Sequence, residues 1–147
     1  MTQTEKALQL IDLCARLPHN TKIAYCTPDK TEVVTLSLAT IKIIEAIPIY
    51  TDFPISVKSY LRPMSSMTEE EKKELSDITG GKFTYVYGIL SNSYQNKDDG
   101  EWHNKCFRYV TLESIILVID WLNKHHFDYR GLIEKGLALE APEGIYE

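Results

Sequence analysis

The chain has 147 residues, of which 44% are apolar and 25% are charged. That length is typical of one domain and buries roughly 70% of the surface of the extended chain, so the composition predicts a globular protein and excludes a disordered or fibrous one. Sixteen Lys and Arg stand against 21 Asp and Glu, and the net charge of −5 disfavours nonspecific binding to nucleic acids or anionic membranes.

The cysteines and the N-terminus indicate the compartment. Cys14, Cys26 and Cys106 are an odd number at wide spacings, which is typical of a reducing environment and not of a disulfide framework. The N-terminus lacks the basic start and apolar run of a signal peptide, and Asp120 interrupts the most apolar stretch, residues 115–122. We therefore expect a cytoplasmic protein with no membrane association.

Local sequence patterns predict helices and strands in a mixed order. Helices are expected where apolar residues recur at helical spacing after a capping residue, at residues 5–16, 69–77, 111–124 and 129–135. Strands are expected where β-branched or aromatic residues gather between turns, at residues 22–26, 32–38, 40–47, 83–89 and 107–109. Residues 40–47 also fit a helix, and we favour the strand.

Polar residues and prolines set the expected boundaries. Thr4, Thr68 and Asp128 are each placed to cap a helix, and Glu71 completes a capping box with Thr68. Gly136 suits the left-handed conformation at a helix end. Three prolines make residues 48–66 a connector with a helical turn at 55–59, and residues 92–100 form a polar loop.

The predicted order is α-βββ-α-ββ-α-α, with no repeat or linker that divides it. We therefore predict a single α+β domain over residues 1–147. Its antiparallel sheet is built from two hairpins plus an extra strand, and its helices pack on one face. The helix at 111–124 carries an apolar stripe too wide to leave exposed, so we expect it to be the most buried helix. The stripe consists of Leu112, Ile115, Ile116, Ile119 and Leu122.

Two stretches resemble a known group of proteins. Residues 60–71 (YLRPMSSMTEEE) and residues 126–139 (HFDYRGLIEKGLAL) resemble segments of small uncharacterised proteins from phages and mobile elements of gut bacteria. The match covers about a sixth of the chain, and Ser59 stands where the group often has proline. The resemblance implies a phage or prophage origin and action in the host cytoplasm. It brings no activity, so no functional residue is carried over.

Metal binding and catalysis find weak support. A zinc site is conceivable from residues of the types that bind zinc, namely Cys26, His103 and Cys106, completed by Cys14 or His19. Zinc sites usually show two pairs of ligands that are close in sequence, and this chain has one such pair. His125, His126 and Asp128 suit a catalytic relay with Cys106 as nucleophile, yet the same residues suit a helix end and a helix cap. We predict no metal, no cofactor and no enzymatic activity.

Three further patterns have a plain structural interpretation. The acidic residues 98–101 lack the alternation of a calcium loop, and residues 80–82 lack the full pattern of a phosphate loop, so both are read as turns. Aromatic residues concentrate on the second hairpin, and strand alternation places half of them in the core, leaving the other half as a candidate binding surface. These aromatic residues are Tyr85, Tyr87, Tyr94, Trp102, Phe107 and Tyr109.

These observations favour a phage or prophage accessory protein that binds a host or phage protein partner. The candidate contacts lie in the two motifs, where connections between elements combine arginine with apolar or aromatic neighbours: Arg62, Met64, Met67, His126, Asp128, Tyr129 and Arg130. We expect both motifs to adjoin, with Arg62 and Arg130 partly exposed. The structural alternative is that Arg62 pairs with a carboxylate such as Asp128.

A second class of function is binding of a small molecule. A protein that sequesters a signalling nucleotide to counter host defence needs a pocket with convergent cations, for which the chain offers Arg62, Lys82, Arg108 and Arg130. A homo-oligomer is compatible with either class of function.

Overall fold

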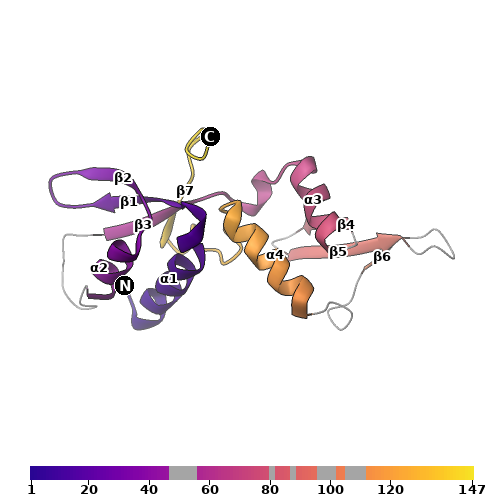
Figure 1. Cartoon of the computed structure of the whole chain (residues 1–147), viewed down its shortest axis with the longest axis horizontal. Helices are drawn as coiled ribbons and strands as arrows, with labels where there is room; N and C mark the ends of the chain where they lie inside the picture. The colour runs from indigo at the N-terminus through magenta and orange to yellow at the C-terminus, as the bar shows by residue number, and fades with distance from the viewer. Residues whose placement is uncertain (47–55, 80–81, 87–88, 96–101, 105–111) are drawn as a thin grey trace. The chain divides into compact units, whose positions relative to one another are not determined.

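Helices and strands alternate along the chain in the computed structural model, which describes residues 1–46, 56–79, 82–86, 89–95, 102–104 and 112–147 (Figure 1). The fold class is α+β, as predicted. The chain forms two compact units, one from residues 1–62 and 126–147 and the other from residues 63–125. The first unit therefore contains both ends of the chain.

The first unit is built on a four-stranded sheet in the order β2-β1-β3-β7. Its strands are β1 (Lys22–Cys26), β2 (Thr31–Thr35), β3 (Ser56–Leu61) and β7 (Ala138–Glu140). The hairpin of β1 and β2 is confirmed, and β1 also pairs antiparallel with β3. β3 pairs parallel with β7, so this sheet is mixed and not purely antiparallel as predicted. Residues 56–59 lie in β3, so the helical turn expected at residues 55–59 is wrong for these four residues. Residue 55 lies outside the described residues.

Helix α1 (Gln3–Arg16) begins two residues earlier than predicted and continues into the 3-10 turn η1 (Leu17–His19). Thr2, not Thr4, caps it: Thr2 Oγ1 accepts from the amide of Glu5 at 3.2 Å, and the Glu5 carboxylate accepts from the amide of Thr2 at 2.6 Å. This reciprocal pair is a capping box. Its four-residue Thr-x-x-Glu signature was present in the sequence.

Helix α2 (Leu38–Ala46) lies where a strand was favoured, so that prediction was wrong. Ser37 Oγ accepts from the amide of Thr40, which caps the helix start. Ile41 and Ile44 are buried at helical spacing, and they pack in a core whose members are Leu13, Ile23, Leu36, Ile41, Ile44 and Val57. Ile41 and Ile44 are three residues apart, so a helix places both on one face, whereas a strand would place them on opposite faces.

The segment between His126 and β7 is a series of turns and not the predicted helix. Asp128 does act as a cap, because its two carboxylate oxygens accept from the amides of Leu132 and Ile133, each at 2.8 Å. Gly131 and Gly136 both have positive φ values, 65° and 68°, which interrupt a helical path. The turns place Leu132, Leu137 and Ala138 in a small core with Leu61.

The second unit contains η2 (Met64–Ser66), α3 (Glu69–Thr79), α4 (Leu112–Lys124) and a three-stranded antiparallel sheet. The sheet has the order β4-β5-β6, with β4 (Lys82–Val86), β5 (Ile89–Gln95) and β6 (Trp102–Asn104). Residues 92–95 are therefore strand where a loop was predicted. The predicted strand at 107–109 lies outside the described residues.

The two helices of this unit match their predicted positions. Thr68 Oγ1 accepts from the amide of Glu71 at 3.2 Å and the Glu71 carboxylate accepts from the amide of Thr68 at 2.8 Å, which confirms the capping box before α3. Helix α4 buries its C-terminal turn, with Trp121 8% and Leu122 3% exposed. Among the described residues, no helix is both long and apolar enough to cross a membrane.

The prediction that α4 is the most buried helix is wrong. Its apolar positions have large exposed fractions: Leu112 73%, Ile116 58%, Leu117 46% and Ile119 38%. In contrast, α1 buries Gln9, Asp12, Leu13 and Arg16. The side of α4 that carries Leu112, Ile116 and Ile119 therefore faces outward, while Ile115 and Val118 are half-buried and the last turn of the helix is buried.

Matched substitutions on α4 test this assignment of faces. We expect Ile119→Asp to change the free energy of unfolding by about 1 kcal/mol or less, because the new carboxylate remains in contact with water. Leu122→Asp should cost about 3 kcal/mol or more, because it places an unpaired charge in the core. Urea denaturation of both variants provides the measurement. Equal losses would show that residue 119 is also in the core.

Candidate functional site

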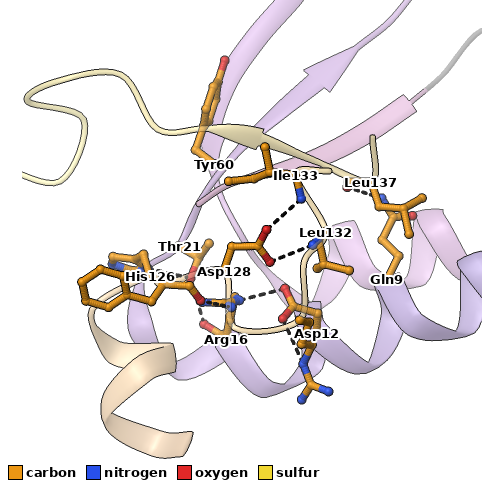
Figure 2. A network of polar contacts seen from close by, with 12 residues as sticks. Gln9, Asp12, Arg16, Thr21, Tyr60, His126, Asp128, Leu132, Ile133 and Leu137 are labelled. Carbon is orange, nitrogen blue, oxygen red and sulfur yellow. Dashed lines mark hydrogen bonds and ion pairs between the residues drawn. The ribbon is translucent and has the colours of Figure 1, made fainter. Parts of the chain in front are cut away.

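A buried ion pair joins helix α1 to the C-terminal segment of the same unit (Figure 2). Asp12 and Arg16 lie one helical turn apart on α1, and both side chains are 0% exposed. Arg16 Nε donates to Asp12 Oδ2 at 2.8 Å, and Arg16 Nη2 donates to the backbone carbonyl of Phe127 at 2.7 Å. The guanidinium therefore connects a helix near the start of the chain to residues near its end.

A second arginine approaches the same carboxylate. Arg130 Nε lies 3.2 Å from Asp12 Oδ1, and the Arg130 side chain is 25% exposed. Both guanidinium groups also lie near the ring of Tyr129. The distance from the guanidinium carbon to the ring centroid is 4.8 Å for Arg130 and 5.6 Å for Arg16. Such cation–π contacts add to the attraction of both arginines for this region. The three charged side chains carry a net charge of +1.

The two sequence motifs meet at Arg62. The amide of Arg62 donates to the carbonyl of His126, and the amide of Asp128 donates to the carbonyl of Arg62, each at 2.8 Å. These bonds form a parallel bridge between Arg62 and Phe127. The Arg62 guanidinium lies 4.3 Å from the centroid of the Phe127 ring. The expected adjacency is therefore confirmed for Arg62 and residues 126–128, and both Arg62 and Arg130 are partly exposed.

His126 is held from two sides in a left-handed backbone conformation, with φ of 61°. Its Nδ1 lies 3.3 Å from Thr21 Oγ1, and its ring stacks on Tyr146 with 3.6 Å between centroids. A non-glycine residue in this region of φ is strained and persists only where its surroundings fix it. The contacts with Thr21 and Tyr146 supply that fixation.

The hydroxyl of Tyr146 connects three parts of the first unit. It donates to the carbonyl of Tyr60 and accepts from the amide of Lys22 at 3.2 Å. Burial is the largest influence on the phenol and raises its pKa from 10.0 to about 12, while the hydrogen bond from Lys22 opposes that change. Nearby, the Gln9 amide donates to the carbonyls of Val57 at 2.7 Å and Leu137 at 3.3 Å.

The structure separates the predicted partner-contact residues into two groups. Met64, Met67, His126 and Asp128 are all at most 8% exposed, so their side chains belong to the packing of the protein and are not available as surface contacts. Arg62, Tyr129 and Arg130 are partly exposed. The motif at residues 126–139 is thus largely a structural element that caps a turn and fills a small core.

The proposed relay residues have other partners. Both oxygens of Asp128 accept from backbone amides, and His126 contacts Thr21. His125, in the second unit, stacks on Trp121 and lies 3.8 Å from the carboxylate of Glu71. No three His, Cys, Asp or Glu side chains gather to hold a metal ion within the described part of the chain. Cys14 is exposed, not buried as a small hydrophobic residue would be.

Several other candidates lie outside the described residues or side chains. These are the zinc candidates His103 and Cys106, the acidic residues 98–101, the turn at 80–81, the cations Lys82 and Arg108, and the aromatic residues of the second hairpin. Tyr85 lies in β4, within the strand predicted at residues 83–89, whereas Tyr94 in β5 and Trp102 in β6 lie in strands where none was predicted.

The outward face of α4 is a surface that the sequence analysis assigned to the core. Trp121 Nε1 donates to Glu74 at 3.1 Å, which holds the C-terminal part of α4 against α3. Leu112, Ile116 and Ile119 follow at steps of four and three residues, so they form one stripe on the helix. A stripe of this kind is equally typical of a core and of a binding surface, and the sequence alone gave no signal to distinguish them.

Comparisons with known proteins return no match: no family model fits the sequence, and no curated protein or solved structure is significantly similar to it.

A pH titration tests the position of the Tyr146 hydroxyl. Because burial raises the pKa of this phenol to about 12, the folded state favours its neutral form. Its contribution to stability is therefore complete below pH 10 and lost as the pH rises through 12. We expect the parent to be more stable than Tyr146→Phe at pH 8, with a difference that shrinks between pH 10 and 12. Urea denaturation at each pH measures the difference in the free energy of unfolding, and Tyr25→Phe is the control. A difference between the parent and Tyr146→Phe that stays unchanged up to pH 12 would contradict the buried position of the Tyr146 hydroxyl.

Proposed function

We propose that this chain is a protein-binding accessory protein of phage or prophage origin, which acts in the cytoplasm of a bacterial host. Its binding surface is the apolar stripe of α4, formed by Leu112, Ile116 and Ile119. The observation that carries the proposal is the exposure of these three side chains, from 38% to 73%, on one face of one helix. Contiguous apolar side chains in water are a mark of interaction surfaces.

The second unit gives this stripe a defined support. The contacts of Trp121 with Glu74 and His125 fix the last turns of α4, and Leu75, which is 0% exposed, lies in the core of the same unit. A helix that is anchored at one end presents its remaining apolar face with little loss of freedom on binding. Such a face fits an apolar groove on a partner, which is a common mode of peptide and helix recognition.

Acidic side chains of the second unit restrict the partner further, and two of them, Glu113 and Asp120, lie on α4 next to the stripe. The exposed acidic residues of α3 and α4 outnumber the exposed lysines, Lys73 and Lys124. The acidic residues are Glu69, Glu70, Glu74, Asp77, Glu113 and Asp120. Opposite charges at the rim of an interface increase the rate of association and select among partners. The fitting partner is therefore a protein whose apolar groove is bordered by Lys or Arg.

The cations that suggested nucleotide binding favour that function less. Arg130 approaches the carboxylate of Asp12 and lies over Tyr129, and Arg62 lies over Phe127. A carboxylate beside the guanidinium opposes the approach of a phosphate by charge repulsion. We therefore retain protein binding as the proposed function.

Two isoleucines with nearly equal exposure provide the test. Ile116 on α4 is 58% exposed and Ile11 on α1 is 56% exposed. Tagged parent, Ile116→Glu and Ile11→Glu are used to capture proteins from lysates of gut bacteria, and the bound proteins are quantified by mass spectrometry. We expect a specific protein to be retained by the parent and by Ile11→Glu and lost with Ile116→Glu.

The captured protein is then purified and its affinity measured by titration calorimetry. Removal of one buried isoleucine from an interface weakens binding by about 10- to 100-fold, and a glutamate at that position adds a desolvation cost. Circular dichroism and thermal melting verify that both variants are folded. Equal binding by both variants would refute the α4 surface, and no specific capture by the parent would refute the proposed function.

A further inference from the structure

We propose that the outer edge of strand β2 binds a second copy of this chain, forming an antiparallel β2–β2 pair about a two-fold axis at Val33. β2 is an edge strand of its sheet in the described structure, with β1 on its one paired side (Figure 1). All five of its residues are exposed, and Val33 is 55% exposed. This strand therefore presents both its side chains and its outer backbone edge to water.

The pairing pattern shows which backbone groups point outward. At the open end of the hairpin the amide of Leu36 donates to the carbonyl of Thr21, and at the turn the amide of Thr27 donates to the carbonyl of Lys30. Hydrogen-bonded and non-hydrogen-bonded pairs alternate along an antiparallel ladder. Residues 30, 32, 34 and 36 therefore direct their backbone groups to β1, and Thr31, Val33 and Thr35 direct theirs away from it.

These three outward residues are self-complementary. When two copies of β2 pair about Val33, Val33 exchanges both backbone hydrogen bonds with Val33 of the partner copy, and Thr31 exchanges them with Thr35. Every outward amide and carbonyl of the strand then has a partner. Two-fold axes at Thr31 or Thr35 would instead pair part of β2 with the turn or with residues beyond the strand, so the axis at Val33 is the one that matches strand to strand.

Side-chain chemistry is compatible with this register. Glu32 lies opposite Val34 of the other copy, and Lys30 lies opposite Leu36, so no like charges lie directly opposite each other. The two copies of Glu32 are diagonal neighbours, and Lys30 of the same copy neutralises each of them. Within each copy, Lys30 Nζ already lies 2.8 Å from the Glu32 carboxylate. Like charges directly opposite would oppose cross-strand pairing, and exposed edges without such charges are known sites of strand addition. The occupant that this edge fits is thus its own copy.

The first test is the oligomeric state over a concentration series. Sedimentation velocity of the parent should show a concentration-dependent monomer–dimer equilibrium. Val33→Pro removes the outward amide and leaves the ladder to β1 intact, since proline is tolerated on an edge strand where its nitrogen faces solvent. We expect Val33→Pro to be monomeric, and Val33→Thr, which keeps the amide, to dimerise. A monomeric parent, or a dimer that persists in Val33→Pro, would overturn the proposal.

A second test reports the register and applies even if Val33→Pro does not fold. Val33→Cys places two thiols opposite each other at about 5.5 Å between Cα atoms, within the range of a disulfide. In Thr35→Cys alone the two thiols are four residues out of register, about 14 Å apart. On mild oxidation we expect Val33→Cys to form a covalent dimer above the background of the parent, which itself has cysteines.

A mixture of Thr31→Cys with Thr35→Cys should also cross-link, whereas Thr35→Cys alone should not. If Thr35→Cys alone cross-links as well as Val33→Cys, the proposed register is wrong. Ile116→Glu should dimerise as the parent does, so failure of the α4 surface and failure of the β2 edge are separate results. Association with a different protein and not with a second copy would also overturn the proposal.

Discussion

The fold of the first unit depends on a charge pair that has no access to water. Asp12 and Arg16 are fully buried, and burial of either charge alone would cost several kcal/mol. The hydrogen bond from Arg16 to the carbonyl of Phe127 and the approach of Arg130 to Asp12 offset part of this cost. Asp12 Oδ1 and Arg16 Nη1 have no hydrogen-bond partner among the described residues, so these few contacts carry the whole compensation. The C-terminal segment must therefore dock on α1 for α1 to be stable in this position, which explains why the unit contains both ends of the chain.

Local features of this fold could be predicted and distant ones could not. The capping box at Thr68 and Glu71 and the hairpin of β1 and β2 depend on residues a few positions apart, and both were predicted. Asp12 and Arg16 have the spacing of an ordinary surface ion pair on a helix. Their burial depends on Phe127, 111 positions further along than Arg16, so no local pattern could indicate it. The same limit applies to α2, where burial of Ile41 and Ile44 decided between two locally compatible structures.

The burial of the motif at 126–139 and the exposure of the α4 stripe move the candidate binding surface from the motif to α4. The motif at 126–139 combines charged and aromatic residues typical of a binding site, yet Phe127, Asp128 and Leu132 are used to close a core and cap a turn. The stripe of α4 has the pattern of a core helix, yet most of it is exposed. Apolar periodicity indicates that a face will be covered, but it does not say whether the cover comes from the same chain or from a partner.

Replacement of Arg16, alone and together with Asp12, tests the central role of the buried pair most directly. Arg16→Met keeps the apolar stem and leaves the carboxylate of Asp12 buried without its main partner, so the free energy of unfolding should fall by about 3–5 kcal/mol. The double variant Asp12→Asn and Arg16→Met removes both charges and should be more stable than Arg16→Met alone. Urea denaturation of the three proteins measures these differences. A loss below about 1 kcal/mol in Arg16→Met, as for an exposed pair, would contradict the account.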